Sequence, residues 1–181
     1  MKKILSIMAA LCCCMALNAN TYSCHIKVTV NGVSSEQDQV QVDVTNSNGL
    51  YTLTLKNFCL TTEGVTLPVG NIEVSGVEGV DEYGYTTILY TEPVIITPGD
   101  DPAFSESEWI GPLLDEVPLD LAARFTATAL SANIDIELAM MGQTIGVNLF
   151  GVAPALKGDV NGDMEVNVTD INEVVNIILN H

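Results

Sequence analysis

The fold is decided by residues 133–151, which read NIDIELAMMGQTIGVNLFG. Apolar side chains occupy every second position on both sides of a short turn: Ile134, Ile136 and Leu138 before Met141-Gly142-Gln143, and Ile145, Val147 and Leu149 after it. A period of two residues puts alternate side chains on opposite faces of a strand, one face buried and the other in water. This stretch therefore predicts two antiparallel strands joined by a tight turn.

The same alternation recurs along most of the chain. Strands are predicted at residues 22–30, 40–44, 51–58, 71–77, 85–96, 114–124, 132–139 and 144–150. Asn46-Ser47-Asn48-Gly49 reads as a hairpin turn, and Pro93 indicates an edge strand or a bulge. About eight short strands with no helical segment between them predict an all-β fold, either a sandwich or a closed barrel.

A long loop is predicted at residues 97–113, TPGDDPAFSESEWIGPL, with room for one helical turn. Long loops on β scaffolds often act as lids or binding elements. The acidic side chains of this loop are expected to be solvated surface groups: Asp100, Asp101, Glu106 and Glu108.

The order and spacing of these segments resemble the calycin-like β-barrel family of secreted bacterial proteins, which are related in shape to lipocalins and fatty-acid-binding proteins. The matching stretches are the N-terminal meander, VGNIEVSGVEG at residues 69–79, and residues 133–151. The early Gly-x-Trp signature of lipocalins is absent, and Trp109 lies in the second half of the chain. The resemblance implies an eight-stranded up-and-down barrel over residues 21–151. Such a barrel is either filled by its own side chains or holds one small lipophilic ligand, and both possibilities stay open.

The N-terminus, MKKILSIMAALCCCMALNAN, has the features of a secretory signal peptide over residues 1–19. Two lysines precede an apolar run of roughly fifteen residues, which is short of the about 20 that a membrane span needs. No other segment is predicted to cross a membrane. The protein is therefore expected to be exported to the periplasm, the cell surface or the medium. Lipid anchoring through Cys12, Cys13 or Cys14 is the less favoured alternative, because Leu or Cys precedes each of them where a small residue is expected.

Export would leave Cys24 and Cys59 in the chain. The predicted meander puts them at opposite ends of the barrel, about 25 Å apart at about 3.3 Å per residue, beyond the roughly 7 Å that a disulfide spans. Two free thiols, buried or half-buried, are predicted.

The composition is strongly acidic. Without Lys2 and Lys3, four basic residues face 23 acidic ones, a net charge of −19. This balance makes nucleic acid and anionic lipid surfaces poor partners and favours divalent cations. No nucleic-acid partner is predicted.

Residues 158–181 carry a spacing of oxygen-bearing side chains that is typical of a calcium loop. Positions 1, 3, 5, 7, 9 and 12 of an EF-hand-type loop fall on Asp159, Asn161, Asp163, Glu165 (through its carbonyl), Asn167 and Asp170. Position 12 is Asp170 in place of a bidentate Glu, and position 6 is Met164 in place of Gly, which would cost about 1 to 2 kcal/mol in a left-handed conformation. The segment resembles a dockerin type I repeat, and this resemblance implies bound Ca²⁺. A metal-free acidic turn that caps a helix is the alternative.

A short helix is predicted after this loop, capped by Thr169 or Asp170. Its apolar residues fall at helical spacing on one stripe: Ile171, Val174, Val175, Ile178 and Leu179. A helix of about eleven residues is too short to be stable alone in water, so the stripe needs a partner surface. Dockerins pair two such repeats to bind a cohesin, whereas this chain has one repeat after a short linker at residues 152–157. The partner is predicted to be the barrel, a second copy of the chain, or a cohesin-like protein.

Catalytic residues are scarce. The chain has two histidines, His25 and His181, and Cys24 is expected to point to the face of its strand opposite His25. Carboxylate pairs are uninformative among 23 acids, so a glycoside hydrolase is suggested only by the dockerin resemblance. The sequence predicts a non-catalytic binding and docking protein. The alternative is an inert barrel that serves as a structural or accessory component of a secreted polysaccharide-degrading assembly.

Overall fold

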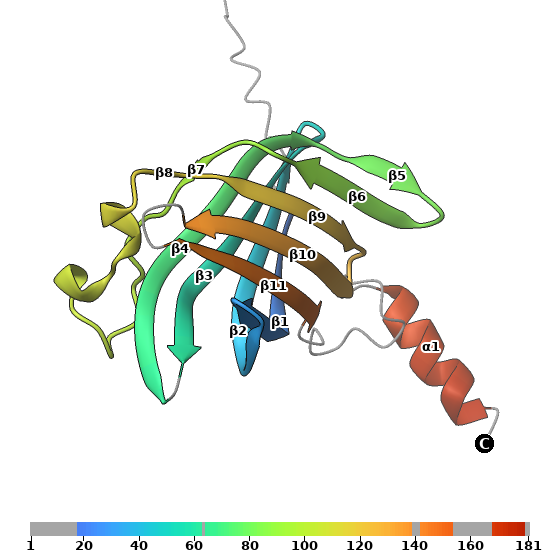
Figure 1. Cartoon of the computed structure of the whole chain (residues 1–181). Helices are drawn as coiled ribbons and strands as arrows, with labels where there is room; N and C mark the ends of the chain where they lie inside the picture. The colour runs from blue at the N-terminus through green and yellow to red at the C-terminus, as the bar shows by residue number, and fades with distance from the viewer. Residues whose placement is uncertain (1–17, 63, 139–141, 154–167, 180–181) are drawn as a thin grey trace, which may run out of the picture.

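In a computed structural model, which describes residues 18–62, 64–138, 142–153 and 168–179, the alternating segments form one curled antiparallel sheet of nine strands (Figure 1). The chain order of its strands is β1 (Asn18–Val30), β2 (Val33–Ser47), β3 (Leu50–Thr62), β4 (Val65–Glu78), β5 (Val80–Glu82), β6 (Tyr85–Tyr90), β9 (Leu119–Phe125), β10 (Ala129–Leu138) and β11 (Gln143–Val152). The spatial order is β4-β3-β2-β1-β11-β10-β9-β6-β5. The predicted all-β class is confirmed.

The two halves of the chain form one sheet because the first strand pairs with the last. β1 runs antiparallel to β11 from Ser23 opposite Val152 to Val30 opposite Ile145. The outer strands of the nine-stranded ladder are β4 and β5, so the described strands form a half-barrel with an open seam beside β4.

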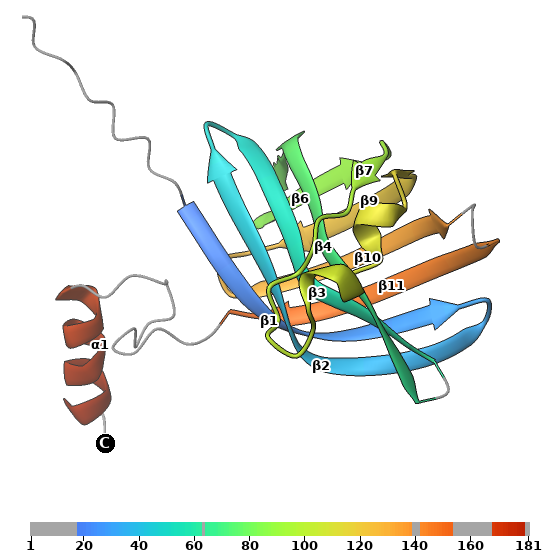
Figure 2. The same ribbon diagram turned by 90° about the vertical axis from the view of Figure 1, so that its left-hand side faces the viewer.

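A segment that we call the strap, residues 91–118, joins β6 to β9 and lies beside this seam. It carries β7 (Val94–Ile95) and β8 (Glu116–Val117), which pair with each other, and two 3-10 turns, η1 (Glu106–Glu108) and η2 (Gly111–Leu113). Figure 2 shows the strap in front of the curled sheet. The predicted long loop with helical turns is therefore confirmed.

The core lies inside the curl and follows the predicted period of two. Burial alternates along β10 and β11, as residues 133–151 predict. The largest fully buried side chains include Tyr22, Phe58, Ile26, Leu53 and Leu55. Tyr22 donates its hydroxyl proton to the carbonyl of Thr126 at 2.6 Å, which satisfies the polar end of this core residue.

Two of the hairpins turn on an Asn-Gly pair. Asn48 and Gly49 have φ of 56° and 86°, as a type I′ turn requires, and Asn46 Oδ1 accepts a hydrogen bond from the Gly49 amide at 2.9 Å. Asn31-Gly32 has the same conformation. The predicted turn at residues 46–49 is confirmed.

The predicted strand count of eight was too low. Proline divides two predicted segments: Pro93 lies between β6 and β7, and Pro118 lies between β8 and β9. A proline has no amide proton to give to a ladder, so neither segment continues as one strand. The short β5 was not predicted. β1 also begins at Asn18, so Asn18 and Ala19, assigned above to the signal peptide, pair with Asn46 and Thr45.

The predicted C-terminal helix is present as α1 (Val168–Leu179). Thr169 and Asp170 lie within its first turn, so neither is the residue that caps it from outside. Over the described part of the chain, no helix combines the length and the apolar character that a membrane crossing needs.

The two described cysteines are free thiols, as predicted. Cys24 is buried and Cys59 is half-buried. Burial raises the pKa of Cys24 to about 11, which keeps this thiol protonated and unreactive at neutral pH.

Candidate functional site

Five of the six predicted calcium ligands lie outside the described residues: Asp159, Asn161, Asp163, Glu165 and Asn167. The sixth, Asp170, is described, and only 3% of its surface is exposed. It is the one charged side chain that is buried among the described residues. A buried carboxylate requires hydrogen-bond donors or a cation, and the first turn of a helix favours negative charge. The structure thus describes Asp170 as a buried carboxylate in the first turn of α1, and its role as a calcium ligand stays a prediction.

The predicted docking stripe of α1 is exposed. The five side chains are between 39% and 76% exposed: Val174, Val175, Ile171, Ile178 and Leu179. Val168 and Ile177 add further exposed apolar surface to the same helix. The barrel, one of the three predicted partners, therefore does not cover the stripe in this structure.

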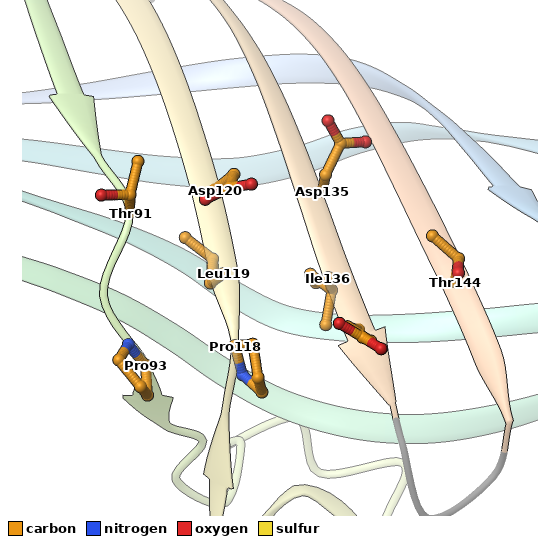
Figure 3. A pocket seen from close by; sticks show the side chains of 9 residues that line it. Thr91, Pro93, Pro118, Leu119, Asp120, Asp135, Ile136 and Thr144 are labelled. Carbon is orange, nitrogen blue, oxygen red and sulfur yellow. The ribbon is translucent and has the colours of Figure 1, made fainter.

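A pocket of about 280 Å³ lies on the outer face of the sheet, between the end of β6 and the β9–β10–β11 ladder (Figure 3). It is lined by Thr91, Pro93, Pro118, Leu119, Asp120, Asp135, Ile136, Glu137 and Thr144. Asp120 and Asp135 stand directly opposite each other on β9 and β10, an arrangement of like charges that is unfavourable without a positive group nearby. The pocket therefore suits cationic or proton-donating groups better than anionic ones.

The sequence did not point to this pocket. Its carboxylates sit at ordinary outward positions of two strands, and only the register of β9 against β10 brings Asp120 and Asp135 together. In the described part of the chain, no cluster of three or more His, Cys, Asp or Glu side chains is arranged to hold a metal ion.

The strap is fastened to the outer edge of β4 by backbone hydrogen bonds. Asn71 and Thr97 exchange two of them, at 2.8 and 3.1 Å, and the Ile110 amide donates to the carbonyl of Pro68 at 3.0 Å. Four strap side chains are buried: Val94, Ile96, Trp109 and Val117. The strap therefore covers the seam that the sheet leaves open beside β4.

The side chains of two asparagines, Asn57 and Asn71, also hydrogen-bond to the strap. We call this set of side-chain hydrogen bonds the latch. Asn57 of β3 accepts hydrogen bonds from the amides of Asp100 (2.8 Å) and Asp101 (3.3 Å) at Oδ1, and it donates from Nδ2 to Asp100 Oδ1 at 2.8 Å. Asn71 of β4 donates from Nδ2 to the carbonyl of Pro98 at 2.9 Å, and its Oδ1 accepts from the Asn57 amide at 2.9 Å. Asn57 has a φ of 51°, a left-handed conformation that asparagine tolerates better than most residues.

Trp109 packs over the latch with only 2% of its surface exposed. The Trp109 and Phe104 rings pack edge to face, with their centroids 5.4 Å apart. A Cβ atom added at Gly99 would lie only 2.5 Å from the indole ring of Trp109. Glycine at position 99 is therefore what lets the indole approach the latch.

The sequence predicts that the acidic side chains of the strap are solvated surface groups. In the structure, three of them form hydrogen bonds within the protein. Asp100 is bound to Asn57, and Asp101 Oδ1 accepts from the Ala103 amide at 2.9 Å. Glu108 accepts from both the amide and the hydroxyl of Ser105, at 2.7 and 2.6 Å, and these bonds lower the pKa of Glu108.

The one described histidine is separate from the cysteines. His25 faces outward, with Nδ1 at 2.7 Å from Asp38 Oδ1 and Nε2 at 3.9 Å from Glu36 Oε2, whereas Cys24 faces the core. The hydrogen bond to Asp38 raises the pKa of His25. As predicted, Cys24 and His25 lie on opposite faces and do not form a nucleophile–base pair.

The fold is similar to that of two solved structures. One is a candidate outer membrane protein from Bacteroides fragilis, with a TM-score of 0.51, 15% sequence identity, and coverage of 74% of this chain and 50% of that one. The other is a Bacteroides ovatus protein of unknown function, with a TM-score of 0.39, 14% identity, and coverage of 75% and 41%, a likeness too weak to support an argument. This chain thus spans half the length of the first of them.

No curated protein matches the sequence. The family model of the calycin-like β-barrel domain matches residues 19–151, which is most of the chain and includes every strand of the curled sheet except the first residue of β1 and the last of β11. The chain therefore belongs to the calycin-like β-barrel domain family.

Proposed function

We propose that this chain is an exported, non-catalytic docking protein, in which the barrel is a rigid support and α1 binds another exported protein. The observation that carries the proposal is the exposed apolar stripe of α1. A twelve-residue helix is marginal by itself in water. Burying five aliphatic side chains against a partner would contribute at most about 10 kcal/mol, more than enough to stabilise the helix in a complex.

Calcium is the proposed cofactor of this tail. The ligands would be Asp159, Asn161, Asp163, the carbonyl of Glu165, Asn167 and Asp170, in the spacing of a calcium loop. The position of Asp170 supports this assignment, because it lies in the first turn of α1 at the spacing of the twelfth loop position. The ion would order the loop and fix the start of the helix.

Charge indicates what kind of partner fits. The chain has a formal charge of −17, and α1 contains Asp170 and Glu173 but no Lys or Arg. Two copies would repel each other on approach, whereas an apolar groove rimmed by basic residues would attract the helix. The dockerin resemblance suggests a cohesin-like protein with such a groove.

Export is supported by the N-terminal run of apolar residues behind Lys2 and Lys3. It is also consistent with the description of the Bacteroides fragilis protein of similar fold as a candidate outer membrane protein.

The docking function can be tested by capture from the exported proteins of the source cell, followed by binding measurements on the purified partner. We expect a partner that is retained with calcium, released by a chelator, and lost in the Ile171→Asp/Ile178→Asp variant. Asn172→Ser, on an exposed polar position of the same helix, is the matched control and should bind as the wild type does. Equal binding by the double variant would refute the proposal. A calcium-dependent dimer in native mass spectra would show instead that the partner of α1 is a second copy of this chain.

A second candidate function is carriage of a small lipophilic ligand inside the barrel. It is suggested by membership of the calycin-like family. The inward side chains of the sheet form one buried apolar cluster, so a ligand that enters between them would have to be lipophilic. A barrel of this size holds one small ligand or fills itself with side chains. Organic extracts of the purified protein, analysed by mass spectrometry, would contain the ligand if the barrel carries one. Extracts without a ligand, together with no uptake of a lipophilic probe, would leave the barrel as an inert support.

A further inference from the structure

We propose that residues 98–113, the outer part of the strap, form a lid that opens as one unit to admit an apolar ligand through the seam beside β4. The inference rests on the second proposed function, ligand carriage by the barrel. It assigns the route by which the ligand enters.

The lid is held together by its own contacts. The Ser105–Glu108 capping box closes η1, and the Phe104 and Glu108 amides donate to the carbonyls of Asp101 and Ser105 at 3.1 and 3.0 Å. The edge-on contact of Phe104 with Trp109 ties the two ends of this turn together. A loop packed by its own side chains can move without losing its internal structure.

The lid is fastened to the barrel by polar bonds that water can reach, by the backbone bond from the Ile110 amide to the Pro68 carbonyl at 3.0 Å, and by the packing of Gly111 on Ile96 and Val69. The three bonds between Asn57 and the backbone and side chain of Asp100 and Asp101 are exposed or only partly buried, as is the bond from Asn71 to Pro98. Each such bond contributes only about 1 kcal/mol, because water replaces it when it breaks. Segments open most readily where their hydrogen bonds are accessible to solvent, as the bonds between Asn57 and the lid are.

Opening would uncover the core at the seam. Ile96 and Val69 are buried members of the core cluster, and Gly111 of the lid lies so close to both that an added Cβ would overlap the Ile96 side chain and the Val69 carbonyl. The adjacent parts of the strap stay anchored, since Val94 and Val117 remain in the core and Thr97 remains bonded to Asn71. Lifting the lid therefore exposes an apolar entrance and leaves the barrel walls in place.

The test uses Asn57→Asp. Asparagine and aspartate have nearly the same shape, and both tolerate the left-handed backbone at position 57. The new carboxylate would face Asp100 Oδ1 where the amide now donates at 2.8 Å, so one hydrogen bond becomes a repulsion. Asn133→Asp is the matched control, because it changes an exposed, hydrogen-bonded asparagine on the outer face of β10.

Trp109 is the single tryptophan of the chain, so its fluorescence reports on the lid alone. We expect Asn57→Asp to increase acrylamide quenching of Trp109 and to accelerate association of the neutral probe N-phenyl-1-naphthylamine about tenfold at pH 7.5. Both effects should shrink as the pH falls and the new carboxyl group binds a proton, because it can then donate to Asp100 as the amide did. Asn133→Asp should behave as the wild type at every pH.

Three results would contradict the proposal that residues 98–113 open as a lid. Unchanged quenching in Asn57→Asp would mean that the latch does not hold these residues down. Increased quenching with an unchanged association rate would mean that the ligand enters elsewhere, while carriage by the barrel stands. Increased quenching with no probe bound by any variant would remove both the entrance and the carrier function.

Discussion

Gly151 allows the last strand to close onto the first, and replacing it by alanine tests this contact. Gly151 of β11 stands opposite Cys24 of β1. A Cβ at position 151 would overlap Cys24 Sγ and would lie 3.2 Å from Tyr22 Cβ and 3.3 Å from the Ser23 carbonyl oxygen. Forcing an extra methyl group into a packed core usually costs about 1 to 3 kcal/mol. Gly151→Ala should therefore lower the free energy of unfolding by about 2 kcal/mol.

The reasoning can be checked by a double-mutant cycle in urea, followed by circular dichroism of the β-sheet. A loss of about 2 kcal/mol should lower the urea midpoint by about 1 M. Cys24→Ala removes the sulfur that the new methyl group would strike. We therefore expect Gly151→Ala to cost less than about 0.5 kcal/mol in that background, a coupling energy of about 1.5 kcal/mol.

Gly146→Ala on the same strand is the control, since its Cβ would lie 3.4 Å from Asp135 Oδ1, an ordinary contact. This change should leave stability unaltered or raise it by up to about 1 kcal/mol. An equal cost of Gly151→Ala with and without the sulfur of Cys24 would refute the packing that is assigned to the β1–β11 pair.

Three further predictions concern single side chains. Asp38 raises the pKa of His25, so this pair should contribute its full stabilisation below the unfolded pKa of about 6.5. The contribution should be lost as the pH rises through the folded pKa of His25. NMR titration should give a lower pKa for His25 in Asp38→Asn than in the wild type, and an equal pKa would contradict the contact. Cys59 should react with a thiol reagent in the folded protein, while Cys24, with its pKa of about 11, should react only on unfolding; equal rates would show that Cys24 is not enclosed. Asp170→Asn should weaken calcium binding at least about tenfold in calorimetric titrations, and an unchanged affinity would remove Asp170 from the proposed ligand set.

The strands could be predicted from the sequence because burial on one face imposes a period of two, which residues 133–151 display without interruption. The number of strands was harder to predict. Pro93 was a visible signal of a break, but Pro118 has the same effect and lies inside an alternating segment, where its missing amide proton is easily overlooked.

The existence of the strap was predictable as a long loop, but its attachment to β3 and β4 and the outer pocket were not, because each depends on residues far apart in the chain. Asn57 and Asp100 are 43 residues apart, and nothing local to either marks the bond between them. Trp109 lies in a polar loop, yet it is buried because Gly99 leaves space for its indole. The apolar stripe of α1 was predictable from helical spacing, but its exposure was not, because the spacing does not tell which surface, if any, covers the helix.

The pairing of β1 with β11 also sets the order in which the protein can fold. Ser23 meets Val152 across almost the whole length of the domain, so the barrel cannot close until its final strand has left the ribosome. Contacts of such long range make folding slow, because the entropy of closing the loop must be lost before the contact forms. The pairs of β1 with β2, β2 with β3 and β3 with β4 join neighbouring segments, so these hairpins can form first and the β1–β11 pair that unites the sheet is expected to form last.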